Sequence, residues 1–582
     1  MINQFEKRER LLLICLILIG TSIFIRLFYL QVIKHDFFTE KSLSQLKRII
    51  RLYPNRGNIY DRQKQGLALT QRSYSAYAIP PEIENKWVFA KLTAPLLELD
   101  RKELSDTLYQ SKAPFLWLNR QISQEQKEKL EALDINGIGF IKTEKRVYPQ
   151  PLLSSHILGF VGIDNQGLGG LEYKFDEQLK GSPGKIVLEG DPKGKKLLTG
   201  TKKTIPANNG NHIVTTIDSY IQYMAQKHLD ESVERMQAKK GHVVVMDPKT
   251  GDVLALACTP NFNSNLWQQS KTRERKNTTI QDIFEPGSVF KLITLAAVLE
   301  EELVSPKTTL YVPETLTLYN RTIKEAHRRE KGEPDTVSVS EIIQKSLNVG
   351  TSLLAQKLGE ENFYNYIERF RFGQKTGIEL PGEGRGILRP VDKWSGVDIA
   401  MISFGQGIAV TSLQMTAAIA AIANDGVYMQ PRIVQYIADH NFETMKATPI
   451  KRKGQIISKR TAKQVKDIMF KVVERGTGTS AQIKGYSIGG KTGTAQKAKE
   501  NGLGYAKGEY ISSFIGFFPV YDPQYVIYVV VDTPKKSIWG SVAAAPVFKK
   551  IAENIIDYKN ILPDKYIQKD DRIILSQEQL QF

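Results

Sequence analysis

The chain has 582 residues, 41% of them hydrophobic and 24% charged, which is the composition of a globular protein too long for one compact core. Its 80 Lys and Arg against 62 Asp and Glu leave a net charge of +18, which favours an anionic neighbour such as a membrane surface, a nucleic acid or an acidic polymer. No basic helix, zinc-ligand spacing or aromatic RNA-binding signature accompanies this charge, so we disfavour nucleic acid and expect anionic lipid headgroups.

The N-terminus carries a predicted membrane anchor at residues 11–33, after a short tail of residues 1–10. Leu11–Ile25 contains no charge and Leu27–Ile33 continues the apolar run after Arg26, which gives about the twenty residues that a spanning helix needs. A cleavable signal peptide is the alternative, but no small-x-small cleavage site precedes the polar chain. Basic residues flank both ends of the run, so their count does not set the orientation.

Residues 34–240 read as a mixed α+β region with many glycines. Ser75–Ile79 has the pattern of a strand, and the charged stretch Gln124–Leu133 has that of a helix. A helix is predicted at Ile221–Lys239, and a domain boundary follows it near residue 240.

Residues 241–560 are predicted to form an α+β domain, an antiparallel sheet with helices packed on it, followed by a polar tail at 561–582. Strands are expected at Val243–Met246, Val253–Ala257, Tyr486–Ile488, Ser512–Val520 and Tyr525–Asp532. Helices are expected at Phe290–Glu301, Val339–Leu358, Leu413–Asn424, Ala462–Glu474 and Val542–Ile556.

The first chemical motif is Ser288 followed three residues later by Lys291. Pro286 and Gly287 before the serine indicate a turn that feeds a helix, so the serine lies near the positive end of the helix dipole and the amine lies on the same face. The helix is apolar nearly all round and should be buried, which would lower the pKa of Lys291 and let a neutral amine accept the serine proton. Ser182 and Lys185 have the same spacing, but no apolar helix follows them.

The second motif is Ser346-Leu347-Asn348, which we place on a tight turn between helical stretches. Its hydroxyl can relay a proton and its amide can bind a substrate carbonyl. A helix cap is the structural alternative for this pattern taken alone.

The third motif is Lys491-Thr492-Gly493-Thr494, at the start of the late strands. The lysine and the hydroxyls can hold a carboxylate, the sheet edge can pair with an extended peptide, and a glycine lets a substrate backbone approach. The decoy Lys375-Thr376-Gly377 precedes a loop signal and is interpreted as structural.

No metal site or cofactor is predicted. The seven histidines are scattered without ligand spacing. Cys15 lies in the apolar run and Cys258 far downstream, so no disulfide is expected between them.

The three motifs, in this order, form the set shared by penicillin-binding proteins and serine β-lactamases. The whole chain resembles the class B penicillin-binding proteins, because the N-terminal region is also similar to them at Arg56–Arg62, Arg146–Pro149, Gly167–Glu172 and Thr216–Asp218. The catalytic half adds similar segments at Ser403–Ile408 and Val410–Gln414.

This resemblance implies a non-catalytic pedestal domain of the penicillin-binding protein dimerisation type at 34–240 and a transpeptidase domain at 241–560. It implies a serine-type peptidoglycan D,D-transpeptidase that binds β-lactams covalently and uses no cofactor. Ser288 would be the nucleophile, Lys291 its base, and Ser346 the proton relay. Asn348 would bind the donor amide, and Lys491, Thr492 and Thr494 would bind the donor carboxylate. Gly493 would belong to the same substrate-binding strand, and the N–H groups of Ser288 and Thr494 would form the oxyanion hole.

The cellular role and partners are expectations from the same resemblance. Gly167–Glu172 and Ser513–Pro519 look more like the septal, cell-division branch than the elongation branch, although the leucine at 347 departs from the division pattern. The expected location is the inner membrane, with the catalytic domain on the periplasmic side and a membrane glycosyltransferase and division proteins as partners. The alternatives are an elongation enzyme, a carboxypeptidase or endopeptidase, a β-lactamase or antibiotic sensor, and an inactive divisome scaffold.

Overall fold

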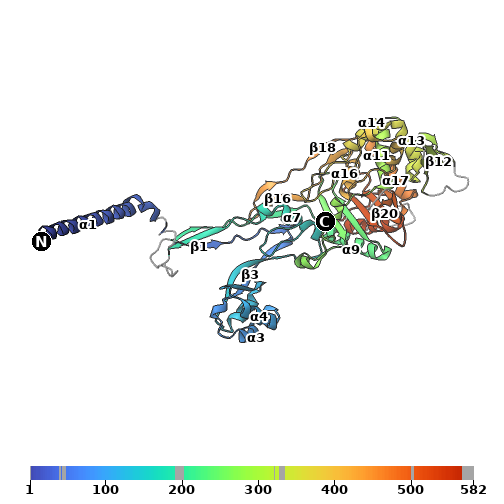
Figure 1. Ribbon diagram of the computed structural model, residues 1–582. Coiled ribbons are helices and arrows are strands. Elements are labelled where there is room, and N and C mark those ends of the chain that lie inside the picture. The colour runs from blue at the N-terminus through green and yellow to red at the C-terminus, as the bar shows by residue number, and fades with distance from the viewer. Residues whose placement is uncertain are drawn as a thin grey trace, which may run out of the picture. The chain divides into compact units, whose positions relative to one another are not determined.

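The computed structural model describes residues 2–38, 41, 47–189, 202–319, 321–326, 334–499 and 504–565 (Figure 1). Contacts divide the chain into two compact units. One comprises Met1–Asn55 with Gly181–Gly210, and the other comprises Arg56–Lys180 with Asn211–Phe582. Most of the predicted polar tail, residues 566–582, lies outside the described residues.

The first unit contains the helix predicted to span a membrane. Helix α1 (Ile2–Phe28) runs into a short π-helix (Tyr29–Ile33), and the stretch Lys7–Ile33 is long and apolar enough to cross a membrane. Its apolar side chains are exposed, Leu11 for example to 65%, which is favourable only in an apolar surrounding. The unit also holds a three-stranded antiparallel sheet of β1 (Lys47–Leu52), β6 (Gly184–Glu189) and β7 (Lys202–Ile205).

The N-terminal part of the second unit is built on a seven-stranded sheet with the order β17-β16-β8-β2-β3-β4, in which β5 also pairs with β3. Helices α3, α4 and α5 cover one face of β3, β4 and β5, and a separate apolar core lies between them. The elements are β2 (Ile59–Tyr60), β3 (Gly66–Ala78), α3 (Lys86–Leu97), α4 (Arg101–Gln110), β4 (Leu116–Ile122), α5 (Gln124–Glu131), β5 (Ile138–Val147), α6 (Ser155–Leu158), α7 (Gly170–Lys174), α8 (Asp176–Leu179), β8 (His212–Thr215), β16 (Val434–Ala438) and β17 (Thr444–Ala447).

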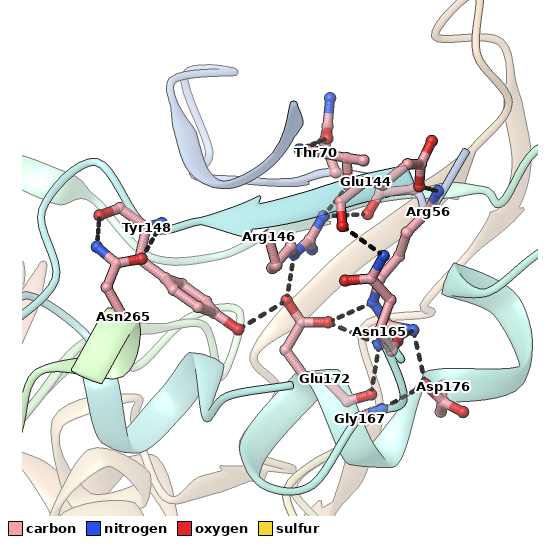
Figure 2. Close-up of polar contacts among 12 residues, drawn as sticks. Arg56, Thr70, Glu144, Arg146, Tyr148, Asn165, Gly167, Glu172, Asp176 and Asn265 are labelled. Carbon is pink, nitrogen blue, oxygen red and sulfur yellow. Dashed lines mark hydrogen bonds and ion pairs between the residues drawn. The ribbon is translucent and has the colours of Figure 1, made fainter. Parts of the chain in front are cut away.

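One buried ion network joins three of the N-terminal segments named above, Arg56–Arg62, Arg146–Pro149 and Gly167–Glu172 (Figure 2). The carboxylate of Glu172, on α7, has no exposed surface and lies 2.7 Å from Arg56 Nη2 and 2.6 Å from Arg146 Nε. Arg56 also pairs with Asp176 at 2.7 Å, and the Tyr148 hydroxyl donates to Glu172 at 3.3 Å. Residues 56, 146 and 172 are far apart in the sequence, so this network fixes the path of the chain before the catalytic domain.

The catalytic part is a five-stranded antiparallel sheet with helices on both faces, which confirms the predicted α+β class. The strand order is β10-β9-β21-β20-β19, so β19 is an outer strand. Side chains alternate along β21: Val526, Tyr528 and Val530 pack on the helices of the middle insert, and the residues between them pack on α9 and α19. In Figure 1 the insert helices α11, α13, α14, α16 and α17 gather above β20.

The strands of this domain are β9 (Lys240–Met246), β10 (Val253–Thr259), β19 (Gly489–Ala498), β20 (Tyr505–Phe518) and β21 (Tyr525–Asp532). The helices are α9 (Ser219–Met236), α10 (Thr278–Gln281), η4 (Gly287–Phe290), α11 (Lys291–Glu300), α12 (Val339–Gln344), α13 (Asn348–Leu358), α14 (Glu360–Arg369), α15 (Asp398–Ser403), α16 (Ser412–Ala423), α17 (Lys459–Arg475), α18 (Gly540–Ala543) and α19 (Ala545–Lys559). Short strand pairs decorate the insert, namely β11 (Thr309–Tyr311) with β14 (Thr336–Ser338), β12 (Thr315–Leu318) with β13 (Arg321–Lys324), and β15 (Val427–Met429) with β18 (Arg452–Gln455).

The predicted strand at Tyr486–Ile488 is wrong, because the strand begins at Gly489 and contains the third motif itself. Ser487 is held outside the ladder: its N–H donates to Asp564 Oδ1 at 2.7 Å and its hydroxyl accepts the N–H of Val520 at 2.9 Å. The Asp564 carboxylate takes the backbone N–H of Ser487 away from the sheet, so the strand begins only at Gly489.

The pattern at Val339–Leu358 forms two helices instead of one, with the predicted tight turn of the second motif between them. Helix α12 ends at Gln344 and α13 begins at Asn348. The closing helix is also divided, into α18 and α19, at Ala544.

Helix α9 lies before the predicted boundary at residue 240 but packs into the catalytic core. Its apolar face, including Ile221, Ala225 and Leu229, shares a cluster with Val243 on β9 and Ile555 on α19. The domain limits stay a prediction, and this packing favours a catalytic domain that begins with α9.

Candidate active site

Ser288 lies in η4, the single 3₁₀ turn that leads into α11, and its side chain is half-buried. The preceding Gly287 has φ +60° and its N–H donates to Gly405 O at 3.1 Å. A Cβ on Gly287 would lie 3.0 Å from the Ala495 side chain on β19. The turn is therefore pressed between the Gly405 loop and β19, which fixes the serine beside the third motif.

Lys291 is fully buried at the start of α11. Its Nζ donates to Ser346 O at 2.6 Å and to Asn348 Oδ1 at 2.8 Å, with a longer contact of 3.3 Å to Ser346 Oγ. Burial lowers its pKa to about 7, against an opposing effect of the Glu325 carboxylate. In the neutral form two N–H groups serve the two short contacts, and one lone pair remains to accept a proton.

The second motif presents Ser346 between two buried amines. Its backbone has φ +58°, a conformation that is uncommon for a side chain other than glycine. Besides the contact with Lys291, its hydroxyl accepts a hydrogen bond from Lys491 Nζ at 2.8 Å. Burial, and the positive charge of Lys291, lower the pKa of Lys491 well below its usual value. The structure thus joins all three motifs through one hydroxyl.

Asn348 is the first residue of α13, so the helix-cap reading applies only in part: the asparagine lies inside the helix and Leu347 occupies the cap position. Its side chain accepts from Lys291 and donates through Nδ2 to Lys324 O at 2.9 Å. The cap is supplied by Glu325, whose carboxylate accepts the N–H groups of Asn348 and Val349. Glu325 was missed by sequence reasoning, because nothing local marks a residue 23 positions away as the cap.

The third motif lies on the outer strand β19. Thr492 Oγ1 donates to Thr477 Oγ1 at 2.9 Å, and Thr494 Oγ1 accepts the N–H of Gly540 at 3.4 Å. Thr477 is a second residue that sequence reasoning missed. It belongs to the run Gly476-Thr477-Gly478-Thr479, and this alternation of glycine and threonine was the sequence feature that could have marked it as a site residue.

The packing around Gly493 requires a glycine, apart from any contact of this residue with substrate. A Cβ there would lie 2.3 Å from Ser513 Oγ on β20 and 3.1 Å from Val289 on η4. The glycine therefore lets the serine turn pack against β19.

The motif Lys375-Thr376-Gly377 has a structural role, as the sequence analysis interpreted it. Thr376 is buried, and its hydroxyl and N–H both donate to Glu383, at 2.5 and 2.6 Å. The carboxylate holds this segment as a closed loop. Cys15 and Cys258 are free, and within the described ranges no three His, Cys, Asp or Glu side chains gather as metal ligands.

This arrangement fits acyl transfer by a serine. The half-buried Ser288 lies one helical turn before a lysine whose pKa is near neutrality, a second hydroxyl bridges two amines, and β19 is the outer strand of the sheet, the position at which an extended peptide can add. A proton taken from Ser288 can pass through Lys291 and Ser346 to a leaving amine.

Two family models match the chain. The penicillin binding protein transpeptidase domain matches residues 241–553, and the penicillin-binding protein dimerisation domain matches residues 51–215. Among curated proteins, stage V sporulation protein D of Bacillus subtilis (strain 168) is 35% identical over 575 residues, which cover 97% of this chain and 88% of the relative. The probable peptidoglycan D,D-transpeptidase PenA of Neisseria gonorrhoeae is 33% identical over 543 residues, with 92% and 90% covered.

Solved structures give the same result. A peptidoglycan synthetase from Bifidobacterium adolescentis ATCC 15703 has a TM-score of 0.72 at 27% identity and covers 90% of this chain and 98% of that one. Penicillin binding protein 3 from Mycobacterium tuberculosis, complexed with aztreonam, has a TM-score of 0.69 at 28% identity, with 89% and 98% covered. On these matches and the three joined motifs, the chain belongs to the penicillin-binding proteins with a transpeptidase domain and a dimerisation domain.

Proposed function

We propose that this protein is a serine-type peptidoglycan D,D-transpeptidase that cross-links stem peptides and binds β-lactams covalently. The observation that carries the proposal is the position of Ser346, whose hydroxyl contacts both Lys291 and Lys491. These residues lie 55 and 145 positions from the serine in the sequence, and the fold brings them into one hydrogen-bonded group. The name of the Neisseria relative, a probable peptidoglycan D,D-transpeptidase, supports the same activity.

In this proposal Ser288 attacks the carbonyl carbon between the two D-alanines of the donor. Lys291 takes the hydroxyl proton, and Ser346 passes a proton to the departing amine of the terminal D-alanine. The N–H groups of Ser288 and Thr494 receive the charge that forms on the carbonyl oxygen. An acceptor amine then attacks the ester carbon, releases Ser288 and forms the cross-link.

The donor is held by the second and third motifs. Asn348 binds the amide of the penultimate D-alanine, and Lys491, Thr492 and Thr494 bind the terminal carboxylate, while Gly493 keeps β19 close to the nucleophile. Thr477 orients the Thr492 hydroxyl through the 2.9 Å hydrogen bond between them.

The test is intact-mass spectrometry of the full-length chain with benzylpenicillin. We expect one stable adduct that Ser288→Ala abolishes and Ser182→Ala keeps, because Ser182 has the same spacing to a lysine but lies exposed in another unit. A folded chain without an adduct would point to an inactive scaffold. Rapid hydrolysis of the penicillin would point to a β-lactamase.

The membrane helix supports a single-pass anchor in the cytoplasmic membrane, with the catalytic domain on the outer side where peptidoglycan lies. A membrane-embedded glycosyltransferase and other division proteins are the proposed partners. The test of topology is a cysteine accessibility assay with an impermeant thiol reagent on cells. Labelling of a cysteine introduced at exposed Tyr311 before lysis is expected, and protection until lysis would reverse the topology.

The proposed stage is septal synthesis during division, supported by the segments Gly167–Glu172 and Ser513–Pro519. The Bacillus relative, whose name assigns it to stage V of sporulation, makes spore formation a second candidate. Depletion in the host separates these roles. Filamentous cells are expected for septal synthesis, rounded cells for elongation, and normal growth with defective spores for sporulation.

A further inference from the structure

A cavity of about 1050 Å³ lies against the outward face of α9, away from the serine turn. The inward face of this helix packs on the sheet in the cluster that includes Val243 and Ile555, whereas α11, which follows the nucleophile, packs in the cluster on the other face. In Figure 1 α9 lies below β20 and the insert helices lie above it. An occupant of this cavity therefore does not reach Ser288, and the cavity is separate from the active site.

Parts of the chain that are far apart in the sequence build the cavity. The turn between β2 and β3 supplies Gln63 and Gln65, the segment after β5 supplies residues 150–153, and α9 with the last turn of α19 supplies most of the remaining wall. Gln63 Nε2 donates to the Tyr558 hydroxyl at 2.6 Å, which ties the turn to α19. A ligand in this cavity contacts the N-terminal part and the catalytic part of the second unit at the same time.

The end of the cavity at the first turns of α9 is aromatic and apolar. Tyr220, Tyr223, Tyr558 and Leu152 line it, and the rings of Tyr220 and Tyr558 pack with their centroids 4.3 Å apart. Tyr223 and Leu152 are 50% and 49% exposed. Large apolar side chains that gather in a concave site, instead of lying singly on the surface, indicate that the site binds apolar groups.

The other end of the cavity is acidic. Asp230, Glu231 and Glu234 line it against one lysine, Lys227, so the lining carries a net charge of −2 in a chain whose net charge is +18. Glu231 pairs with Lys550 at 3.1 Å, but Asp230 and Glu234 form no ion pair within the ranges that the structure describes. This end therefore attracts cations and repels phosphates, nucleic acids and anionic lipids.

Asp230 is the most shielded of the three carboxylates. It accepts Gln226 Nε2 at 2.9 Å and the Thr259 hydroxyl, both neutral donors. Burial raises its pKa against these hydrogen bonds. A cation that entered the cavity would favour its ionised form and offset part of the cost of burial.

The remaining polar groups of the lining are those that pair with a peptide backbone. Gln63, Gln65, Gln150 and Gln226 each carry a carboxamide, which both donates and accepts hydrogen bonds as a peptide group does. From Ser219 to Glu234 the wall formed by α9 is about 22 Å long, at 1.5 Å per residue. An extended chain of about seven residues covers this length.

We propose that this cavity docks an extended segment of a partner protein, about seven residues long, with apolar side chains at the Tyr220 end and Lys or Arg side chains at the Glu234 end. The site goes beyond the proposed transpeptidase function and does not depend on it. The apolar side chains pack among the tyrosines, and the basic side chains form charge-assisted hydrogen bonds with Asp230 and Glu234. The carboxamides pair with the backbone of the segment.

The experiment measures the fluorescence anisotropy of labelled heptapeptides mixed with the full-length chain in detergent, with benzylpenicillin present to occupy the active site. One probe reads leucine, phenylalanine, alanine, glycine, alanine, lysine, lysine, and a second has the reverse order. Control peptides carry glutamate in place of both lysines. We expect one of the two orders to bind with a Kd below about 100 μM and its glutamate control to bind at least about tenfold more weakly.

Two variants locate the bound probe. The double variant Asp230→Asn with Glu234→Gln should weaken its binding about tenfold, and Tyr223→Ala should weaken it by a similar factor. The matched control is Glu128→Gln, which changes an exposed carboxylate in the middle of α5 and should keep the wild-type affinity. Benzylpenicillin uptake should stay unchanged in all three variants, which shows that they are folded.

A wild type that binds neither probe, or binds the lysine and glutamate peptides equally, overturns the proposal whatever the folding of the variants. Binding that the double variant and Tyr223→Ala both keep would place the probe elsewhere on the molecule and also overturns it. Mass photometry of the unliganded chain tests a second copy as the occupant. A dimer that the double variant abolishes would assign the cavity to self-association and not to a partner protein.

Discussion

Lys291 is the residue on whose protonation the proposed chemistry depends. Its amine is buried, its pKa is lowered to about 7, and its two short hydrogen bonds run to Ser346 O and Asn348 Oδ1. A base with a pKa near the working pH is present in its neutral form in a useful fraction and still accepts a proton readily.

The first prediction concerns pH. Because the depressed pKa makes the neutral amine dominant above about pH 7, penicillin acylation should rise with pH through this value and then level off. Lys291→Met should lower the acylation rate by about a thousandfold. Stopped-flow acylation with a fluorescent penicillin measures both. Lys466→Met, which removes another buried lysine paired with Asp425 at 2.8 Å, should keep the pH profile. A wild-type rate independent of pH would contradict the assignment.

The second prediction concerns Glu325. Its charge raises the pKa of Lys291, so Glu325→Gln should shift the pH profile of acylation toward lower pH. Its oxygens also cap α13, so the maximal rate should fall as Asn348 loses its support. Glu300→Gln is the matched control, because Glu300 accepts the N–H of Ser458 at the start of α17. If both variants shifted the profile equally, a specific effect of Glu325 would be excluded.

At the scale of elements, the contact between η4 and β19 positions the nucleophile. Gly287 and Gly493 make this contact possible, because a Cβ at either position would crowd the opposing element. A strand and a turn that touch this closely have no room to accommodate even a methyl group without movement.

The third prediction tests this contact. Gly493→Ala should destabilise the protein by about 1–3 kcal/mol and slow acylation, since its Cβ would lie 2.3 Å from Ser513 Oγ. Ser513→Ala in the same chain removes that oxygen and should restore part of both losses. Urea unfolding and penicillin acylation of the two single variants and the double variant measure the coupling. Strict additivity of the two substitutions would show that the Ser513 contact is not the cause.

At the scale of the whole molecule, the buried network of Glu172 fixes the chain that precedes the catalytic domain (Figure 2). Two guanidinium groups share the Glu172 carboxylate, which is the only acidic partner of Arg146 among the ion pairs of the described residues, whereas Arg56 also pairs with Asp176. Both arginines and the glutamate are buried. Removing one partner of such a network leaves buried charge without compensation.

The fourth prediction follows from this network. Glu172→Gln should lower the free energy of unfolding by about 3–5 kcal/mol, because Arg56 and Arg146 lose their shared counter-charge. Asp164→Asn removes an exposed partner of Arg120 and should cost less than about 1 kcal/mol. Urea unfolding followed by tryptophan fluorescence compares them. Equal losses in the two variants would show that burial of the network does not matter.

Local sequence patterns were sufficient for the elements whose neighbours lie close in the chain. The helices α9 and α17 follow from apolar residues that repeat every three to four positions. The apolar run at 11–33, the helix α16 and the strands β9, β10 and β21 follow from continuous apolar stretches, whose length separates helix from strand. The strand expected at Tyr486–Ile488 failed because Asp564, far along the chain, binds Ser487. A hydrogen-bond partner so far away in the sequence cannot be predicted from the residues around Ser487.

The site divides in the same way. The three motifs, the burial of the Lys291 helix and the turn at Ser346 could be predicted before folding was considered, since each depends on residues within a few positions. The contacts of Ser346 with both Lys291 and Lys491, the cap of α13 by Glu325 and the hydrogen bond from Tyr505 to Glu285 could be found only in the folded chain. These contacts join residues that lie far apart in the sequence and that the packing of the sheet and its helices brings together. Pattern within a short window fixes local conformation, but it carries no information on which distant side chain fills the remaining hydrogen bond.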